Sequence, residues 1–156
     1  MKILISPFSK TMRNGKENPK NYPYWEEVVR LLQEKGHEVI QLKYGNEKDV
    51  PECKSIVSYS SVKVAETILD TADTFICVDN FLQHLAHYKG KRGVVIWGKS
   101  DPLLFGYAEN VNLLKDRKFL RNHQFEAWDA EEFDAKVFVD PQIVVDSVEK
   151  IGVLKK

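Results

Sequence analysis

The most informative residues for chemistry stand where an apolar run ends. The run Thr74–Val78 is followed directly by Asp79 and Asn80. Both residue types are favoured at the N-cap of a helix, so a helix is predicted to begin at Phe81. A helix start presents free backbone N–H groups, here those of Phe81 and Leu82, and these attract phosphate. Two interpretations of Asp79 and Asn80 are open at this stage: contact with an anionic ligand, and helix capping alone.

Polar groups also follow the other apolar runs of the chain. Lysines and phosphate attract one another, and a carboxylate such as that of Glu47 can accept hydrogen bonds from ribose hydroxyls or a base amine. The combination predicts a nucleotide-shaped site, although each lysine alone is equally explained as a solvated surface residue. The candidates are Ser9, Lys10, Arg13, Lys16, Lys20, Asn46, Glu47, Asp79, Asn80, Ser100 and Asp101.

Other common site chemistries have no support in the sequence. It has no G-x-G-x-x-G, Walker A or G-x-S-x-G motif. His84 and His87 lie three apart on the predicted helix, a weak metal spacing, so we expect no metal and no cofactor. His84 is a candidate for ligand binding or acid–base chemistry, and packing of the helix against the sheet is the alternative. Cys53 and Cys77 form no redox or metal spacing, which favours a reducing compartment.

Length and charge narrow the classes of protein further. The 156 residues predict one domain, 1–156, and 23 basic residues balance 23 acidic ones. Zero net charge argues against binding nucleic acid by charge alone. No apolar run reaches the roughly 20 residues of a membrane span, and the N-terminus is expected to be a strand, not a signal peptide. We therefore expect a cytoplasmic protein.

Strand and helix patterns alternate along the chain. This alternation predicts an α/β fold, a single Rossmann-like domain whose mostly parallel sheet carries helices on both faces. Ligand sites of such sheets lie at the carboxyl ends of the strands, where the polar candidates stand. A long exposed loop is expected at Phe8–Lys20. The expected strands are Lys2–Ser6, Glu38–Leu42, Ser55–Tyr59, Thr74–Val78, Gly93–Trp97 and Asn112–Leu114, and Val137–Val139 is expected to be an edge strand or an extended segment. The expected helices are Tyr22–Lys35, a helix from Ser60 or Ser61 to Asp70, Phe81–Lys89 and Gln142–Ile151. Val62 and Ile143 are expected to point inward.

The central stretch VDNFLQHLAHYKGKRGVVIWGKSDPLLFGY resembles the signature of family 9 glycosyltransferases, the lipopolysaccharide heptosyltransferase family. In words, that signature is a strand, Asp-(Thr/Ser)-Gly, two residues, His-Leu-Ala, a small turn, an apolar strand and Gly-Pro-(Ser/Thr)-Asp-Pro. Here it stands as Asp79-Asn80-Phe81, His84-Leu85-Ala86, Val94–Trp97 and Gly98–Pro102. Upstream, Lys20–Pro23 resembles the family's Lys-x-(Trp/Phe)-Pro.

The resemblance implies one half of a two-domain GT-B enzyme, the C-terminal, donor-binding half. It implies that the ligand is a nucleotide-diphosphate sugar, with Lys20 at the phosphates and Glu47 near the ribose. The motif around Asp79 and the helix start would meet the phosphates and the sugar. By motif position, the donor-binding residues would include Lys20, Glu47, Asp79, Asn80, Phe81 and His84.

The sequence departs from the family pattern at informative positions. Phe81 replaces a glycine whose missing side chain allows close approach to phosphate, and Asn80 replaces a hydroxyl residue. The half that would supply the general base is not part of the resemblance. The catalytic residue is therefore unassigned, with Asp79, His84 and Asp101 as candidates.

These observations leave several functions open. One is a glycosyltransferase-like enzyme, which binds the donor and transfers its sugar to an unknown acceptor. The alternatives are a non-catalytic nucleotide or nucleotide-sugar binding module, the donor-binding subunit of a split enzyme, and a domain whose pocket Phe81 fills. A partner supplying the acceptor domain, or self-association, is expected for the split enzyme.

Overall fold

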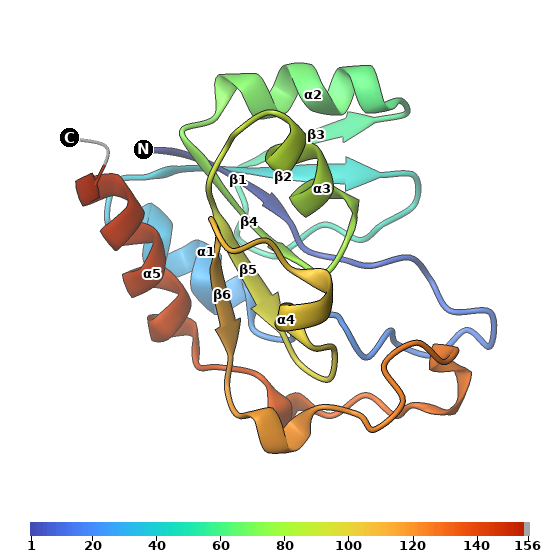
Figure 1. The fold of residues 1–156 in the computed structure, drawn as a ribbon. Coiled ribbons are helices and arrows are strands. Elements are labelled where there is room, and N and C mark those ends of the chain that lie inside the picture. Colours follow the sequence, from blue (N-terminus) through green and yellow to red (C-terminus); the bar gives the residue numbers. More distant parts are fainter. Residues whose placement is uncertain (155–156) are drawn as a thin grey trace.

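The structure is a computed structural model that describes residues 1–154. It contains one six-stranded, wholly parallel sheet with the strand order β3-β2-β1-β4-β5-β6 (Figure 1). The strands are β1 (Lys2–Ser6), β2 (Glu38–Tyr44), β3 (Ser55–Tyr59), β4 (Thr74–Val78), β5 (Val94–Trp97) and β6 (Val111–Leu114). The helices are α1 (Trp25–Glu34), α2 (Val62–Thr71), α3 (Phe81–Tyr88), α4 (Pro102–Phe105) and α5 (Pro141–Leu154). The predicted α/β, Rossmann-like architecture is confirmed.

Two apolar layers fix the helices to opposite faces of the sheet. Alternate residues of a strand point to opposite faces, so Ile3 and Ile5 of β1 pack with α1 and α5, whereas Leu4 packs with α2 and α3. The central strand β4 is buried along its whole length. This explains why β1 and β4 are recognisable in the sequence as short, continuous apolar runs.

Some predicted local details are wrong. Of the two alternatives for Val137–Val139, the edge strand is wrong because the segment pairs with no strand, whereas the backbone of Phe138 is extended. Val137 is the last residue of a short 3₁₀ helix, Ala135–Val137, and the apolar side chains of Val137–Val139 are buried against the α1 and α5 side of the core. Val62 and Ile143 are exposed instead of inward. Helix α1 begins at Trp25 and not at Tyr22 as predicted. Tyr22 is buried before the helix, and its hydroxyl donates a hydrogen bond to the Val139 carbonyl.

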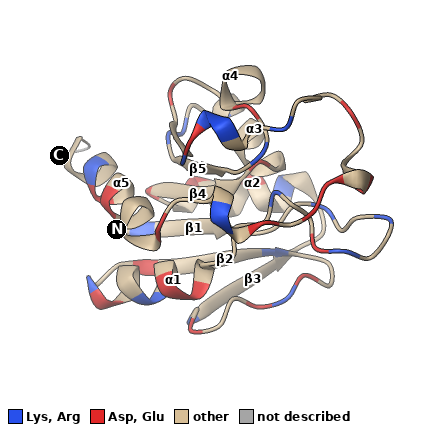
Figure 2. Cartoon of the chain, turned by 90° about the horizontal axis from the view of Figure 1, so that it is seen from below, with Lys and Arg blue, Asp and Glu red and all other residues tan. Residues whose placement is uncertain are grey.

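Two long segments meet at the carboxyl ends of the strands. The first is the loop of residues 7–24, whose tip is exposed as predicted but whose Met12, Asn18 and Asn21 are buried. The second, residues 115–140, we call the strap; it runs from β6 beneath the sheet to α5 (Figure 1). Lys16 of the loop forms an ion pair of 3.2 Å with Glu132 of the strap. The loop is mostly basic, whereas the strap carries most of its basic residues in 115–121 and most of its acidic ones in 126–134 (Figure 2).

Candidate functional site

The predicted site residues divide between two neighbouring hollows at the carboxyl ends of the strands. We name them after a carboxylate that lines each one. The Glu47 hollow, about 270 Å³, is lined by Phe8, Ser9, Thr11, Gly15, Lys16, Glu17, Asn18, Asn21, Asn46, Glu47 and Lys48. The Asp79 hollow, about 230 Å³, is lined by Lys20, Asp79, Ser100, Phe105, Arg121, Gln124, Phe125, Glu126 and Trp128.

Most residues that line the Glu47 hollow are of polar types, and the hollow lies between the first loop and the turn after β2. Glu47 accepts a hydrogen bond of 3.3 Å from the backbone N–H of Tyr44. Burial raises the pKa of the Glu47 carboxyl above its ordinary value, and Lys43 partly opposes this shift. The carboxylate is thus held at the rim of a hollow where it can accept hydrogen bonds from a ligand's hydroxyl or amine groups.

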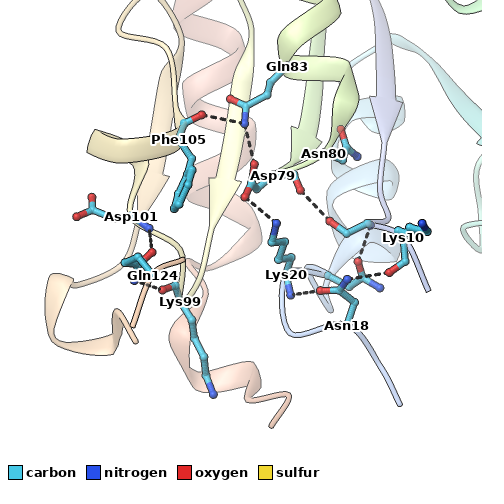
Figure 3. A network of polar contacts seen from close by, with 12 residues as sticks. Lys10, Asn18, Lys20, Asp79, Asn80, Gln83, Lys99, Asp101, Phe105 and Gln124 are labelled. Carbon is cyan, nitrogen blue, oxygen red and sulfur yellow. Dashed lines mark hydrogen bonds and ion pairs between the residues drawn. The ribbon is translucent and has the colours of Figure 1, made fainter. Parts of the chain in front are cut away.

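An ion pair of Lys20 and Asp79 lines the Asp79 hollow, and the backbone of both residues contacts residues that line the Glu47 hollow (Figure 3). Lys20 Nζ lies 3.0 Å from Asp79 Oδ2, and the side chains are only 24% and 12% exposed. Ser9, which lines the Glu47 hollow, donates its hydroxyl to the Asp79 carbonyl at 2.8 Å. Asn18, also in that hollow, accepts from the Lys20 backbone N–H at 2.9 Å. The pair therefore sits at the boundary, with one positive and one negative group.

Gln83 also holds Asp79, and the sequence reasoning missed it. Its amide is fully buried; Nε2 donates to Asp79 Oδ1 at 2.8 Å and to the Phe105 carbonyl at 3.3 Å (Figure 3). The signal in the sequence is spacing, since Gln83 lies four residues, about one helical turn, after Asp79. With Lys20 on Oδ2 and Gln83 on Oδ1, the orientation of the carboxylate is fixed.

Asn80 is committed to the protein itself. Its Oδ1 accepts from the Leu82 N–H at 3.0 Å, which caps α3 and occupies one of the two N–H groups proposed for phosphate. Its Nδ2 donates to the carbonyls of Ser6 and Phe8 and to the Ser6 hydroxyl, each at 3.1 Å. Asn80 lines neither hollow, so the structure supports the capping interpretation for this residue.

Phe81 also lines neither hollow. Its ring packs against that of Tyr59 on β3, with 5.5 Å between centroids, and against the core on that side of the sheet. The replacement of the family's glycine therefore leaves both hollows open, and Phe81 does not fill them.

Two of the three catalytic candidates lie away from the hollows or are engaged. His84 is exposed on α3, and its Nδ1 is 2.7 Å from the Tyr107 hydroxyl. Asp101 caps α4 through the Leu103 N–H and forms a two-pronged ion pair with Arg117, at 2.8 and 3.1 Å. Arg117 lowers the pKa of the Asp101 carboxyl. Only Asp79 lines a hollow.

Of the remaining candidates, Ser100 is buried in the lining of the Asp79 hollow, and Lys10 is exposed on the first loop, outside both linings. Trp128 stacks under the Arg121 guanidinium at 3.7 Å from the ring centroid, and Lys20 Nζ lies 5.4 Å from the same centroid.

Among residues 1–154, no group of three or more His, Cys, Asp or Glu side chains is arranged to hold a metal ion. The same residues include no helix that is long and apolar enough to span a membrane.

In its fold, the wholly parallel, Rossmann-like sheet matches one half of a GT-B glycosyltransferase. The model of glycosyltransferase family 9 (heptosyltransferase) matches residues 2–132, and the chain belongs to this family. The comparison with curated proteins finds no match.

Solved structures of similar fold are twice as long as this chain. The E. coli ADP-heptose lipopolysaccharide heptosyltransferase II has a TM-score of 0.70 at 12% identity, over 99% of this chain and 47% of its own. The iron-containing dodecameric glycosyltransferase TibC from enterotoxigenic E. coli has a TM-score of 0.71 at 17% identity, over 99% and 45%. E. coli heptosyltransferase WaaC with ADP-2-deoxy-2-fluoro heptose gives 0.64 at 13% identity, over 99% and 43%. The chain thus spans about half the length of these enzymes.

Proposed function

We propose that this chain binds a nucleotide-diphosphate sugar as the donor-binding half of a glycosyltransferase. The nucleoside occupies the Glu47 hollow, the diphosphate lies beside Lys20, and the sugar enters the Asp79 hollow. The observation that carries this proposal is the Lys20–Asp79 pair at the boundary of the two hollows. Neither hollow alone reaches the roughly 300 Å³ of a small ligand pocket, but the two together do.

The same arrangement suits the chemistry of glycosyl transfer. In that reaction an acceptor hydroxyl oxygen attacks the anomeric carbon and its proton passes to a base. The bond from this carbon to the phosphate oxygen breaks, and the diphosphate leaves with an additional negative charge. An ammonium group held at the phosphates stabilises this charge as it develops. Lys20 is mostly buried, where a charge interaction is stronger than in bulk water.

A second candidate function is donor binding without turnover by this chain alone. It is favoured by the state of Asp79, whose two carboxylate oxygens are already taken by Lys20 and Gln83. In this case the base that activates the acceptor comes from a separate acceptor domain or from another copy of the chain.

The proposed function is tested by calorimetric titration with ADP, GDP and UDP, comparing wild type with Lys20→Met. We expect at least one diphosphate to bind, and Lys20→Met to weaken it about tenfold or more, which corresponds to about 1.4 kcal/mol. Lys89→Met is the matched control. Lys89 is 25% exposed and paired with Glu66 and Asp70, but it lies between α2 and α3, outside both hollows. Equal losses in both variants, or no binding by wild type, would reject the site.

Turnover separates the two candidates. We expect hydrolysis or transfer of a bound sugar nucleotide if the chain is itself an enzyme, and Asp79→Asn to abolish it. Tight binding with no product selects the non-catalytic half. A product that appears only after a candidate acceptor-domain protein is added selects the split enzyme.

A further inference from the structure

The Asp79 hollow combines aromatic and polar surfaces. Phe105 and Phe125 contribute aromatic rings, whereas Asp79, Ser100 and Lys20 contribute groups that accept or donate hydrogen bonds. Gln83 connects Asp79 with Phe105, since its Nε2 donates both to the Asp79 carboxylate and to the Phe105 carbonyl (Figure 3). A sugar ring has the complementary chemistry, since its C–H face is apolar and its hydroxyl edges form hydrogen bonds.

Phe125 is unusual because the fold leaves it 81% exposed. Burying a phenylalanine side chain is worth about 1.5–3 kcal/mol, and this one forgoes most of that gain. It lies in the polar stretch His123–Glu126 of the strap. Its ring packs edge-on against Phe105, with 5.3 Å between the centroids.

The turn that presents Phe125 is built by side chains on both sides of it. Arg121 donates to the carbonyls of Gln124, Glu126 and Ala127, closing the backbone around the phenylalanine. The Gln124 side chain then fastens this turn to the segment after β5. Its Oε1 accepts from the Asp101 N–H at 2.8 Å, and its Nε2 donates to the Lys99 carbonyl at 2.9 Å (Figure 3). An exposed aromatic ring is thus held in a defined place at the hollow.

We propose that Phe125, supported by Phe105, is the residue by which this site distinguishes a sugar nucleotide from the bare diphosphate. The ring packs on the C–H face of a pyranosyl group, whose slightly positive hydrogens meet the negative π face. Asp79 accepts hydrogen bonds from the sugar hydroxyls through the lone pairs that Lys20 and Gln83 leave unused, and Ser100 accepts one as well. This inference rests on the proposed function, because it assigns the sugar to the Asp79 hollow.

The test first identifies which of ADP, GDP and UDP binds wild type. For each variant we then compare the affinity for this diphosphate with the affinity for the corresponding ADP-glucose, GDP-glucose or UDP-glucose. Wild type is expected to bind the glucose conjugate more tightly than the diphosphate. Phe125→Ala should reduce this preference about fivefold and leave diphosphate affinity unchanged. Tyr88→Ala is the matched control, because Tyr88 is also 81% exposed but lies at the end of α3, outside the hollow.

Two further variants separate ring stacking from a general apolar contact. Phe125→Tyr should retain the preference for the glucose conjugate, and Phe125→Leu should lose most of it. The inference is overturned if Phe125→Ala leaves the preference unchanged, if it weakens both ligands equally, or if Phe125→Leu behaves as wild type. Diphosphate binding without any preference for the conjugate also overturns it while the proposed nucleotide site stands. If no diphosphate binds wild type, the proposed function fails first.

Discussion

Replacement of Asn80 tests whether this residue ties the first loop to the start of α3. Asn80→Ala removes the cap of α3, worth about 1 kcal/mol. It also removes the Asn80 amide group, which donates to two carbonyls and to the buried Ser6 hydroxyl. Each of these hydrogen bonds that water cannot replace contributes about 0.5–1.5 kcal/mol to the free energy of unfolding. We expect a loss of about 2–4 kcal/mol in the free energy of unfolding. For a domain of this size, that corresponds to roughly 5–15 °C in Tm.

Two variants at the same position separate the cap from the bridge. Asn80→Ser keeps a cap acceptor but cannot bridge to Ser6 and Phe8, so its loss should lie between zero and that of Asn80→Ala. Asn80→Asp keeps a good cap acceptor and gains a favourable charge at the helix start. However, it turns a carboxylate oxygen toward the carbonyl oxygens of Ser6 and Phe8, which cannot donate, so we expect it to be destabilised by more than about 1 kcal/mol.

The measurement is urea unfolding at pH 7, followed by tryptophan fluorescence because Trp25 and Trp97 are buried. Wild-type stability of Asn80→Asp would refute the reasoning, since it would mean that the residue only caps the helix. A fall in nucleotide affinity in Asn80→Asp beyond the fall in stability would contradict the structural assignment of Asn80 and restore the predicted ligand contact.

Two other contacts give separate predictions. Gln83→Leu leaves Asp79 Oδ1 and the Phe105 carbonyl without their donor, so we expect a loss of about 1–3 kcal/mol in urea unfolding and weaker sugar-nucleotide binding; unchanged values of both would mean that the contact does not form. Arg117 lowers the pKa of the Asp101 carboxyl in the folded protein. The ion pair therefore stabilises the fold at pH values above about 3.9, the pKa of an aspartate in the unfolded chain. This contribution is lost as the pH falls further, through the lower pKa of the folded state. Wild type should therefore be more stable than Asp101→Asn at pH 7, with the difference shrinking below about pH 4 in unfolding titrations, and a pH-independent difference would rule out the ion pair as its source.

The strands and their order along the chain were predictable because their signals are local. A strand buried on both faces needs an apolar run, and such runs placed β1 and β4 at their observed bounds. Val137–Val139 carries the same signal, but its apolar side chains are buried without pairing in the sheet. An apolar run reports burial, and the neighbouring chain decides whether the backbone also pairs.

The sequence by itself determined the fold class, the family and the edge of the sheet where polar residues gather. Only the tertiary structure decided which of those residues face a hollow. The partners that settle this come from distant positions: Ser6 engages Asn80 and Arg117 engages Asp101 away from the hollows, whereas Lys20 meets Asp79 in the lining of one. A side chain already satisfied by the fold has few bonds left for a ligand. Local sequence does not reveal such partners, because the folding of the whole chain brings them together.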